Sequence, residues 1–177
     1  MKHFEIESSE IVYQGRAFSV RKDKVRLPNG KTTTLDIVQH TGAVTMIPYD
    51  DEGKIWFVRQ YRHAARQVLL ELPAGTLEEN EPPLEAAERE LKEEIGMAAG
   101  ELKKIGEFYM VPGYSSECMH VFLATQLRPE SLERDPDEFI NVEVIAAPQA
   151  YKMIESGEIR DAKTIASLLL AKPYLSV

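Results

Sequence analysis

The stretch from Gly75 to Met97 reads GTLEENEPPLEAAERELKEEIGM and joins a glycine loop to a helix rich in acids. Pro82 and Pro83 favour the start of a helix, because residues of the first turn need no N–H partner inside the helix. Gly96 favours the end of the helix, because glycine readily adopts the left-handed conformation of a C-cap. We therefore predict a helix between these prolines and this glycine.

Helical periodicity predicts one apolar stripe on this helix, made of Leu84, Ala87, Leu91 and Ile95. Glu90 and Glu94 lie one turn apart beside the stripe, and Glu93 lies further round toward solvent. Carboxylates at this spacing repel each other by about 0.2–0.5 kcal/mol, so either solvation or a cation must offset the repulsion. Mg²⁺ or Mn²⁺ suits such a set, because both ions prefer oxygen ligands. Periodicity alone supports equally a surface helix with the ion pairs Glu85–Arg89 and Arg89–Glu93.

Length and composition predict one globular domain, or one domain with a small appendage. The chain has 177 residues, of which 44% are hydrophobic, and a formal net charge of −8. That charge argues against a nucleic-acid partner, whose phosphates would be repelled. No apolar run approaches the roughly 20 residues of a membrane helix, and the first residues lack a signal-peptide pattern. With Cys118 as its only cysteine, the protein is expected to be cytoplasmic, without a membrane partner.

Strand patterns come before and after the acidic helix. Residues 4–40 alternate in the manner of strands, and Asn29-Gly30 suits a tight hairpin turn, which predicts a small N-terminal antiparallel β-sheet. Residues 43–48 and 55–58 predict a second hairpin, and residues 127–138 predict a charged loop. Two more helices are expected, at 148–156 and from Asp161 to about Lys172. This mixture predicts an α/β fold with a helix–sheet–helix sandwich.

The spacing of the central stretch resembles the complete Nudix box. The matching positions are Gly75, Glu81, Arg89, Glu90, Leu91, Glu93, Glu94, Ile95 and Gly96. The resemblance implies a Nudix-type α/β/α sandwich around a mixed sheet, and hydrolysis of a nucleoside diphosphate linked to another moiety. It also implies two parts of the chain: a catalytic domain at 41–177, and an N-terminal β-sheet region at 1–40 that lies in a dimer interface.

Flanking segments extend the resemblance to the ADP-ribose pyrophosphatase branch of that family. They are VRLPNGK, TGAVTMIP, VRQYR, ELPAG and VPGYSSE, with Pro112 fifteen residues after Met97. The resemblance implies a homodimer and Mg²⁺-dependent hydrolysis of the diphosphate of ADP-ribose to AMP and ribose 5-phosphate. One alternative is the same chemistry on another nucleotide sugar, a dinucleoside polyphosphate or NADH. A second alternative is a non-catalytic module that binds ADP-ribose.

Carried over by position, the resemblance assigns roles around the helix. Glu90, Glu94, Glu93 and the carbonyl group of Ala74 would bind Mg²⁺ or Mn²⁺. Arg89 and Glu81 would brace the loop against the helix, so that Arg89 and Glu93 count among the catalytic residues. The base that activates water would come from a loop before a late strand. Glu138 is the predicted base, with Asp135 and Asp137 as alternatives.

Substrate contacts are predicted from residue type. Arg59 and Arg62 suit phosphates, because a guanidinium group can bind them in a bidentate manner. Tyr61 or Tyr114 would stack on adenine. Ser116 and Glu117 would bind ribose hydroxyl groups. The alternative for each is a surface salt bridge or a half-buried aromatic side chain.

Overall fold

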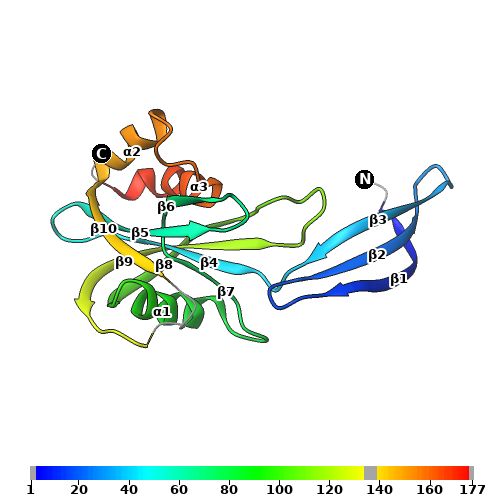
Figure 1. Ribbon diagram of the computed structural model, residues 1–177, viewed down its shortest axis with the longest axis horizontal. Helices are drawn as coiled ribbons and strands as arrows, with labels where there is room; N and C mark the ends of the chain where they lie inside the picture. Colours follow the sequence, from blue (N-terminus) through cyan, green and yellow to red (C-terminus); the bar gives the residue numbers. More distant parts are fainter. Residues whose placement is uncertain (1–2, 134–138, 176–177) are drawn as a thin grey trace. The chain divides into compact units, whose positions relative to one another are not determined.

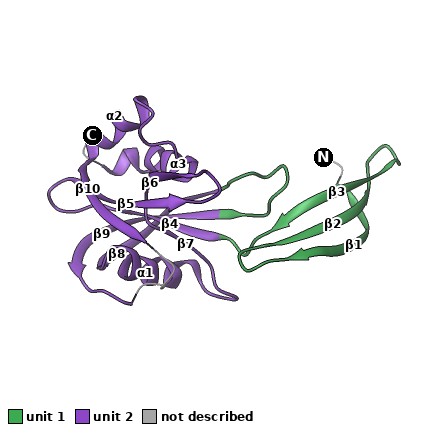
Figure 2. Cartoon of the chain, in the orientation of Figure 1, with its two compact units in different colours: residues 1–42, 109–118 green, residues 43–108, 119–177 purple. Residues whose placement is uncertain are grey.

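A computed structural model describes residues 3–133 and 139–175 of the chain. The chain divides into two compact units, shown in Figure 2. The first unit comprises residues 1–42 and 109–118, and the second comprises residues 43–108 and 119–177. No helix in the described ranges is both long enough and apolar enough to span a membrane.

The first unit contains a three-stranded sheet of β1 (Glu5–Gln14), β2 (Ser19–Arg26) and β3 (Thr32–Gln39). Both strand pairs are antiparallel, which confirms the predicted N-terminal sheet. Gly30 has a φ of +82° in the turn between β2 and β3, a left-handed conformation that glycine adopts without a steric penalty. Residues 109–118 join this unit because Val38 forms backbone hydrogen bonds with Tyr114 and Ser116.

The second unit is a sandwich of helices and sheets (Figure 1). One sheet has the strand order β10-β5-β6 and the other β7-β4-β9-β8. The second is mixed, because β4 pairs antiparallel with β7 and parallel with β9. The strands are β4 (Ala43–Pro48), β5 (Lys54–Arg62), β6 (Gln67–Glu71), β7 (Ala74–Thr76), β8 (Met97–Tyr109), β9 (Cys118–Pro129) and β10 (Ile140–Ala146).

Helices cover the sheets from two sides. α1 (Pro83–Glu94) packs over a core that includes Val44 and Phe122, whereas α2 (Ala147–Glu155) and α3 (Ala162–Ala171) pack over a separate core. A short 3-10 helix, η1 (Lys172–Tyr174), follows α3. Figure 1 shows α1 on the side of the sheets opposite α2 and α3. The predicted α/β/α sandwich around a mixed sheet is therefore confirmed.

Two predictions about strands were wrong. The expected hairpin between 43–48 and 55–58 is reduced to one antiparallel bridge, between Tyr49 and Ile55, because β4 lies between β7 and β9 while β5 belongs to the other sheet. All six residues of β4 are buried, which suits a central strand with a partner on each edge. The predicted loop at 127–138 begins later than expected, because β9 continues to Pro129.

The buried face of α1 also differs from the predicted stripe. Leu84 is 46% exposed, whereas Ala86 and Ala87 are fully buried. The buried apolar residues of the helix are Ala86, Ala87 and Leu91. At 100° per residue, the middle of the face that they form coincides with Glu94 and lies close to Glu90, whereas Leu84 lies at the margin of this face. The two acids therefore lie within the buried face, not beside it.

Candidate active site

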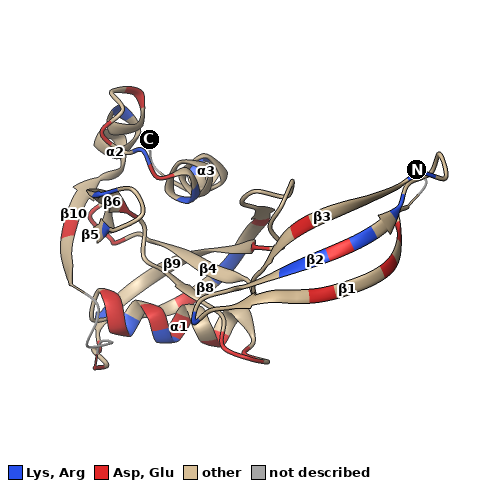
Figure 3. Ribbon diagram, turned by 45° about the vertical axis from the view of Figure 1, so that its right-hand side comes forward, with Lys and Arg blue, Asp and Glu red and all other residues tan. Residues whose placement is uncertain are grey.

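Glu90 and Glu94 of α1 form the centre of the candidate site. Their residues are only 7% and 2% exposed, although both carry a carboxylate. The backbone N–H group of Ala74 donates a hydrogen bond of 2.9 Å to Oε2 of Glu94. This bond ties the last turn of α1 to the first residue of β7. Figure 3 shows acidic positions repeated along α1.

Gly75 allows the close approach between β7 and α1. A Cβ atom added to this glycine would lie 1.8 Å from Oε1 of Glu90 and 1.9 Å from its Cδ. Any side chain at position 75 would therefore displace the Glu90 carboxylate. The glycine is required for space, and it is the reason that the carboxylate can lie against the backbone of the loop.

Arg89 holds three carboxylates with one guanidinium group. Its Nε and Nη2 atoms each donate a 3.0 Å hydrogen bond to Glu81. Its Nη1 atom donates to Glu90 at 2.7 Å and to Glu93 at 2.9 Å. The hydrogen bonds from Arg89 lower the pKa of Glu81, and the bonded carboxylate of Glu81 raises the pKa of Arg89 above its ordinary value. Arg89 thereby braces the loop against the helix and keeps these acids together despite their repulsion.

A third buried carboxylate, Glu71, ends β6 three residues before Ala74. Glu71 is 1% exposed. Arg62 of β5 binds it in a bidentate manner, with Nε donating to Oε1 at 2.9 Å and Nη2 donating to Oε2 at 2.8 Å. Nζ of Lys163 on α3 also donates to Oε2. Burial alone would raise the pKa of Glu71, but the hydrogen bonds and charges of Arg62 and Lys163 outweigh burial and lower it.

The backbone between Glu71 and Ala74 is fixed by neighbouring elements. The N–H group of Leu72 donates to Oγ1 of Thr164 at 2.8 Å. The carbonyl group of Pro73 accepts hydrogen bonds from the N–H group of Met46 at 3.0 Å and from Oγ1 of Thr45 at 3.2 Å. β4 and α3 thus hold the segment that leads into the candidate site. A segment held at this many points presents the Ala74 carbonyl group in a constant position.

Comparison with known proteins places this chain in a family. The NUDIX domain family matches residues 39–168, about three quarters of the chain, which contain all of these carboxylates. The chain belongs to the Nudix family. A second match, to the nucleoside diphosphate sugar hydrolase N-terminal domain, covers residues 4–34.

The similarity to individual relatives covers nearly the whole of this chain. An ADP-ribose pyrophosphatase of Bacillus subtilis is 43% identical over 159 residues, which are 89% of this chain and 86% of the relative. An ADP-ribose pyrophosphatase of Mycobacterium tuberculosis is 40% identical over 94% of this chain and 82% of the relative. The crystal structure of an ADP compounds hydrolase matches with a TM-score of 0.87 and 26% identity, over 98% of this chain and 95% of that one.

Nudix hydrolases generally require a divalent metal ion, and the residues around Glu90 fit one. The donors would be hard oxygen atoms of Glu90, Glu93 and Glu94 and the carbonyl group of Ala74, the β7 residue whose N–H group binds Glu94. The Glu90 carboxylate occupies the space that a side chain at Gly75 would fill. Mg²⁺ prefers oxygen ligands of this kind. These are the residues that the sequence assigned to metal binding, and the structure brings Ala74 next to Glu94 and Gly75 next to Glu90.

The predicted phosphate-binding arginines lie in different surroundings. Arg62 is next to Glu71, close enough to Glu94 for that charge to contribute to its raised pKa after the larger effect of Glu71. Arg59 forms ion pairs with Glu143 of β10 and with Glu158 after α2. Because the two arginines are three residues apart in one strand, their side chains point to opposite faces. The structure does not bring Arg59 to the face that carries Arg62.

The other predicted substrate contacts are spread over both units. Tyr61 is exposed on β5, with its ring at an edge-to-face angle to His63. Tyr114, Ser116 and Glu117 belong to the first unit, where Oγ of Ser116 accepts a 2.9 Å hydrogen bond from the N–H group of His40. The predicted base, Glu138, and its alternatives Asp135 and Asp137 lie outside the described residues.

Sequence reasoning assigned no role to Glu71, Lys163 or Thr164. One signal was present: Glu71 is a single acid that follows the apolar residues Val68, Leu69 and Leu70, and a charge in such a strand needs a partner. The identity of that partner is not visible in the sequence, because Lys163 lies 92 positions further along the chain.

Proposed function

We propose that this Nudix hydrolase cleaves the diphosphate of ADP-ribose to AMP and ribose 5-phosphate, and that it requires Mg²⁺. The carrying observation is the buried pair Glu90 and Glu94, held against Ala74 and Gly75 in a chain that is 43% identical to a protein named ADP-ribose pyrophosphatase. Water is the second reactant. The oxygen atom of the water bonds to one phosphorus while the bond from that phosphorus to the bridging oxygen breaks.

In this proposal Ala74, Glu90, Glu93 and Glu94 hold the divalent ion. When bound, the ion supplies positive charge that activates water and stabilises the leaving phosphate. Arg89 keeps Glu90 and Glu93 in place through the hydrogen bonds from its Nη1 atom. Glu138 accepts the proton of the attacking water, with Asp135 or Asp137 as the alternative acceptor.

Substrate recognition is assigned to the arginine, tyrosine, serine and glutamate residues that the sequence suggested. Arg62 binds a phosphate oxygen, since its side chain is 42% exposed and lies near Glu94. Arg59, which lies on the opposite face of β5 and pairs with Glu143 and Glu158, is not assigned to the phosphates. Tyr61 or Tyr114 stacks on adenine, and Ser116 and Glu117 bind ribose hydroxyl groups.

We also propose a cytoplasmic homodimer formed through the N-terminal region 1–40. Every residue of β1 is exposed in the single chain. The exposed apolar side chains of this region are Phe4, Ile6, Ile11, Val12, Tyr13 and Phe18. A second subunit would remove them from water, which is a favourable process. Light scattering should give twice the mass of one chain, and a charge at Ile11 and Val12 should shift that mass toward the monomer.

The decisive experiment is a substrate panel with Mg²⁺, with Mn²⁺ and with EDTA. The panel contains ADP-ribose, other nucleotide sugars, a dinucleoside polyphosphate and NADH. We expect the highest kcat/KM for ADP-ribose, products AMP and ribose 5-phosphate, and no turnover with EDTA. A higher kcat/KM for another compound would identify that compound, and not ADP-ribose, as the preferred substrate. Tight binding of ADP-ribose without turnover in either metal would instead support the non-catalytic module.

A further inference from the structure

Lys163 of α3 and Arg62 of β5 bind the same buried carboxylate from two sides. Arg62 contacts both oxygen atoms of Glu71, and Lys163 contacts Oε2. The side chain of Lys163 is 8% exposed and that of Glu71 is 2% exposed, whereas that of Arg62 is 42% exposed. The cluster therefore runs from the interior, at Lys163, to the surface, at Arg62.

Arg62 keeps one donor group for a ligand. Its Nε and Nη2 atoms bind Glu71, and within the described residues its Nη1 atom makes no hydrogen bond. The carboxylate of Glu71 is the main cause of the raised pKa of Arg62, with Glu94 as a further contributor. Arg62 thus lies within electrostatic reach of the carboxylates that are proposed to hold the metal ion. A phosphate oxygen near that ion is a suitable acceptor for Nη1.

Lys163 is itself held in place by the start of α3. Its Nζ atom donates to Oδ2 of Asp161 at 2.8 Å. Asp161 also caps the helix, because the same oxygen accepts hydrogen bonds from N of Thr164 at 3.0 Å and from its Oγ1 at 2.6 Å. The ammonium group is therefore fixed, and it fixes the Glu71 carboxylate in turn. Without Lys163, the Arg62–Glu71 pair would lose the contact that ties it to α3.

We propose that Lys163 is a positioning residue: through Glu71 it orients the guanidinium group of Arg62 so that Nη1 binds a phosphate of the diphosphate substrate. This inference rests on the proposed function, whose substrate-binding site it extends to α3. The hydrogen bonds that join Lys163, Glu71 and Arg62 contribute to binding of the substrate in the ground state. Their loss therefore raises KM and leaves kcat nearly unchanged.

The test is steady-state kinetics of Lys163→Met with ADP-ribose and saturating Mg²⁺. We expect KM to rise about tenfold, as for other residues that act through a ligand-binding side chain, while kcat and the Mg²⁺ concentration for half-maximal activity stay within about twofold. Lys163→Arg should recover most of the loss, because a guanidinium group can also donate to Glu71. Lys152→Met, on the exposed side of α2, is the matched control.

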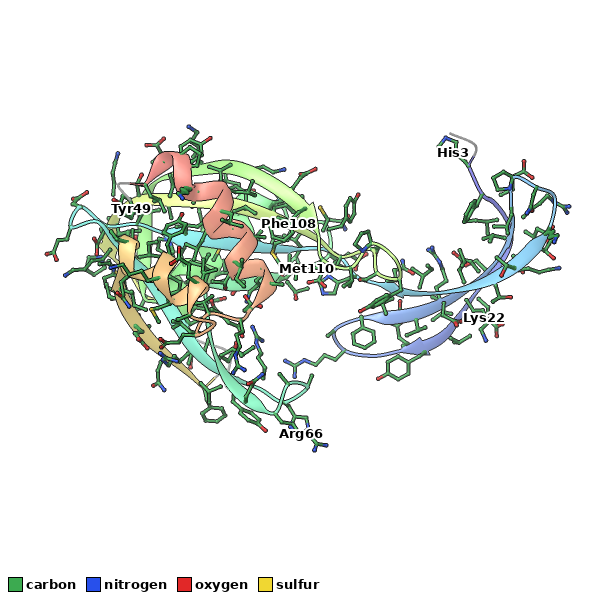
Figure 4. All side chains as sticks on the ribbon, turned by 90° about the horizontal axis from the view of Figure 1, so that it is seen from above. His3, Lys22, Tyr49, Arg66, Phe108 and Met110 are labelled. Carbon is green, nitrogen blue, oxygen red and sulfur yellow. The ribbon has the colours of Figure 1, made fainter. Side chains whose placement is uncertain are left out.

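A double-mutant cycle separates positioning from general destabilisation. If Lys163 acts through Arg62, the KM of Arg62→Ala/Lys163→Met should equal that of Arg62→Ala, because the second change removes nothing further. Arg66→Gln controls for the loss of a guanidinium group, since Arg66 is exposed in the turn between β5 and β6 (Figure 4). Multiplicative effects in the double variant would overturn the proposal.

Two further outcomes have defined meanings. If Lys163→Met does not fold, Glu71→Gln takes its place, because the amide keeps the shape of the carboxylate; an unchanged KM in either folded variant overturns the inference. If the wild-type protein fails to hydrolyse ADP-ribose, the proposed function is wrong. The KM prediction then applies to the diphosphate that the panel identifies, and an unchanged KM for that compound also overturns the inference.

Discussion

The Arg89 cluster and the Glu71 cluster use the same chemistry but differ in how they are assembled. In the first, Arg89 binds Glu81, Glu90 and Glu93, which all lie within nine positions of it. In the second, Glu71 binds Arg62 nine positions away and Lys163 92 positions away. Acids outnumber the arginine in the first cluster. In the second, the cations Arg62 and Lys163 are balanced by Glu71 and by Asp161, which also binds Lys163. The first is therefore suited to accept a metal ion, and the second needs no additional cation.

The largest effect is expected from Glu94→Gln in the Arg89 cluster. The amide can still accept the hydrogen bond from Ala74, so folding should be retained while a metal ligand loses its charge. Loss of about 3 kcal/mol of transition-state stabilisation corresponds to a decrease in kcat of at least about 10²-fold. Glu88→Gln, on the exposed side of the same helix, should keep its activity. A near-normal rate for Glu94→Gln at saturating Mg²⁺ would remove Glu94 from the metal site.

Gly75→Ala should have the next largest effect, because the added Cβ atom would overlap the carboxylate of Glu90. We expect a decrease in kcat of about 10–100-fold and a higher Mg²⁺ requirement, since a ligand is displaced by an ångström or more. Gly113→Ala, where an added Cβ meets nothing within 4 Å, is the control for thermal stability. Equal Mg²⁺ dependence in Gly75→Ala and wild type would contradict the role given to this contact.

Arg89→Lys tests whether one planar group is needed to hold several acids. Lysine carries a compact charge and cannot reproduce the fork that binds Glu81 through two nitrogen atoms and Glu90 and Glu93 through the third. We expect kcat to fall about tenfold, with a smaller change in KM. If Arg89→Lys retains full activity, charge alone is sufficient and the brace between loop and helix is not required.

The smallest effect concerns the pH dependence of stability in the Glu71 cluster. The pKa of Glu71 is lower in the folded protein than its ordinary value of 4.5. A lowered folded-state pKa gives stability that is present above the ordinary pKa and is lost as the pH falls through the folded-state pKa. The free energy of unfolding of the wild type should exceed that of Glu71→Gln by about 1 kcal/mol at pH 7. This difference should shrink below pH 4.5. Urea unfolding at several pH values measures it; a constant difference would show that ionisation of Glu71 contributes nothing.

The comparison also explains what sequence reasoning could predict. Glu90 and Glu94 lie on one helix and Gly75 lies fifteen positions before Glu90, in β7, so helical geometry grouped the acids and the motif spacing added the glycine. The prediction that Leu84 belongs to the buried stripe was wrong, because the width and centre of a buried helix face depend on what packs against it. The prediction of a hairpin from β4 and β5 was wrong for a related reason. Strand β4 is buried on both faces and has partners on both edges, so it does not need to pair with the next strand in the sequence.

The sequence by itself determined the family, the α/β/α architecture and the residues of the carboxylate set, because these depend on local periodicity and fixed spacing. Tertiary structure alone decided which arginine lies near that set, that Gly75 is required for space against Glu90, and that α3 reaches Glu71 through Lys163. The physical reason is that these contacts join residues far apart in the chain. Packing of β5, β6 and α3 around the buried carboxylate of Glu71 brings Arg62 and Lys163 together. No local sequence pattern predicts that these residues bind Glu71.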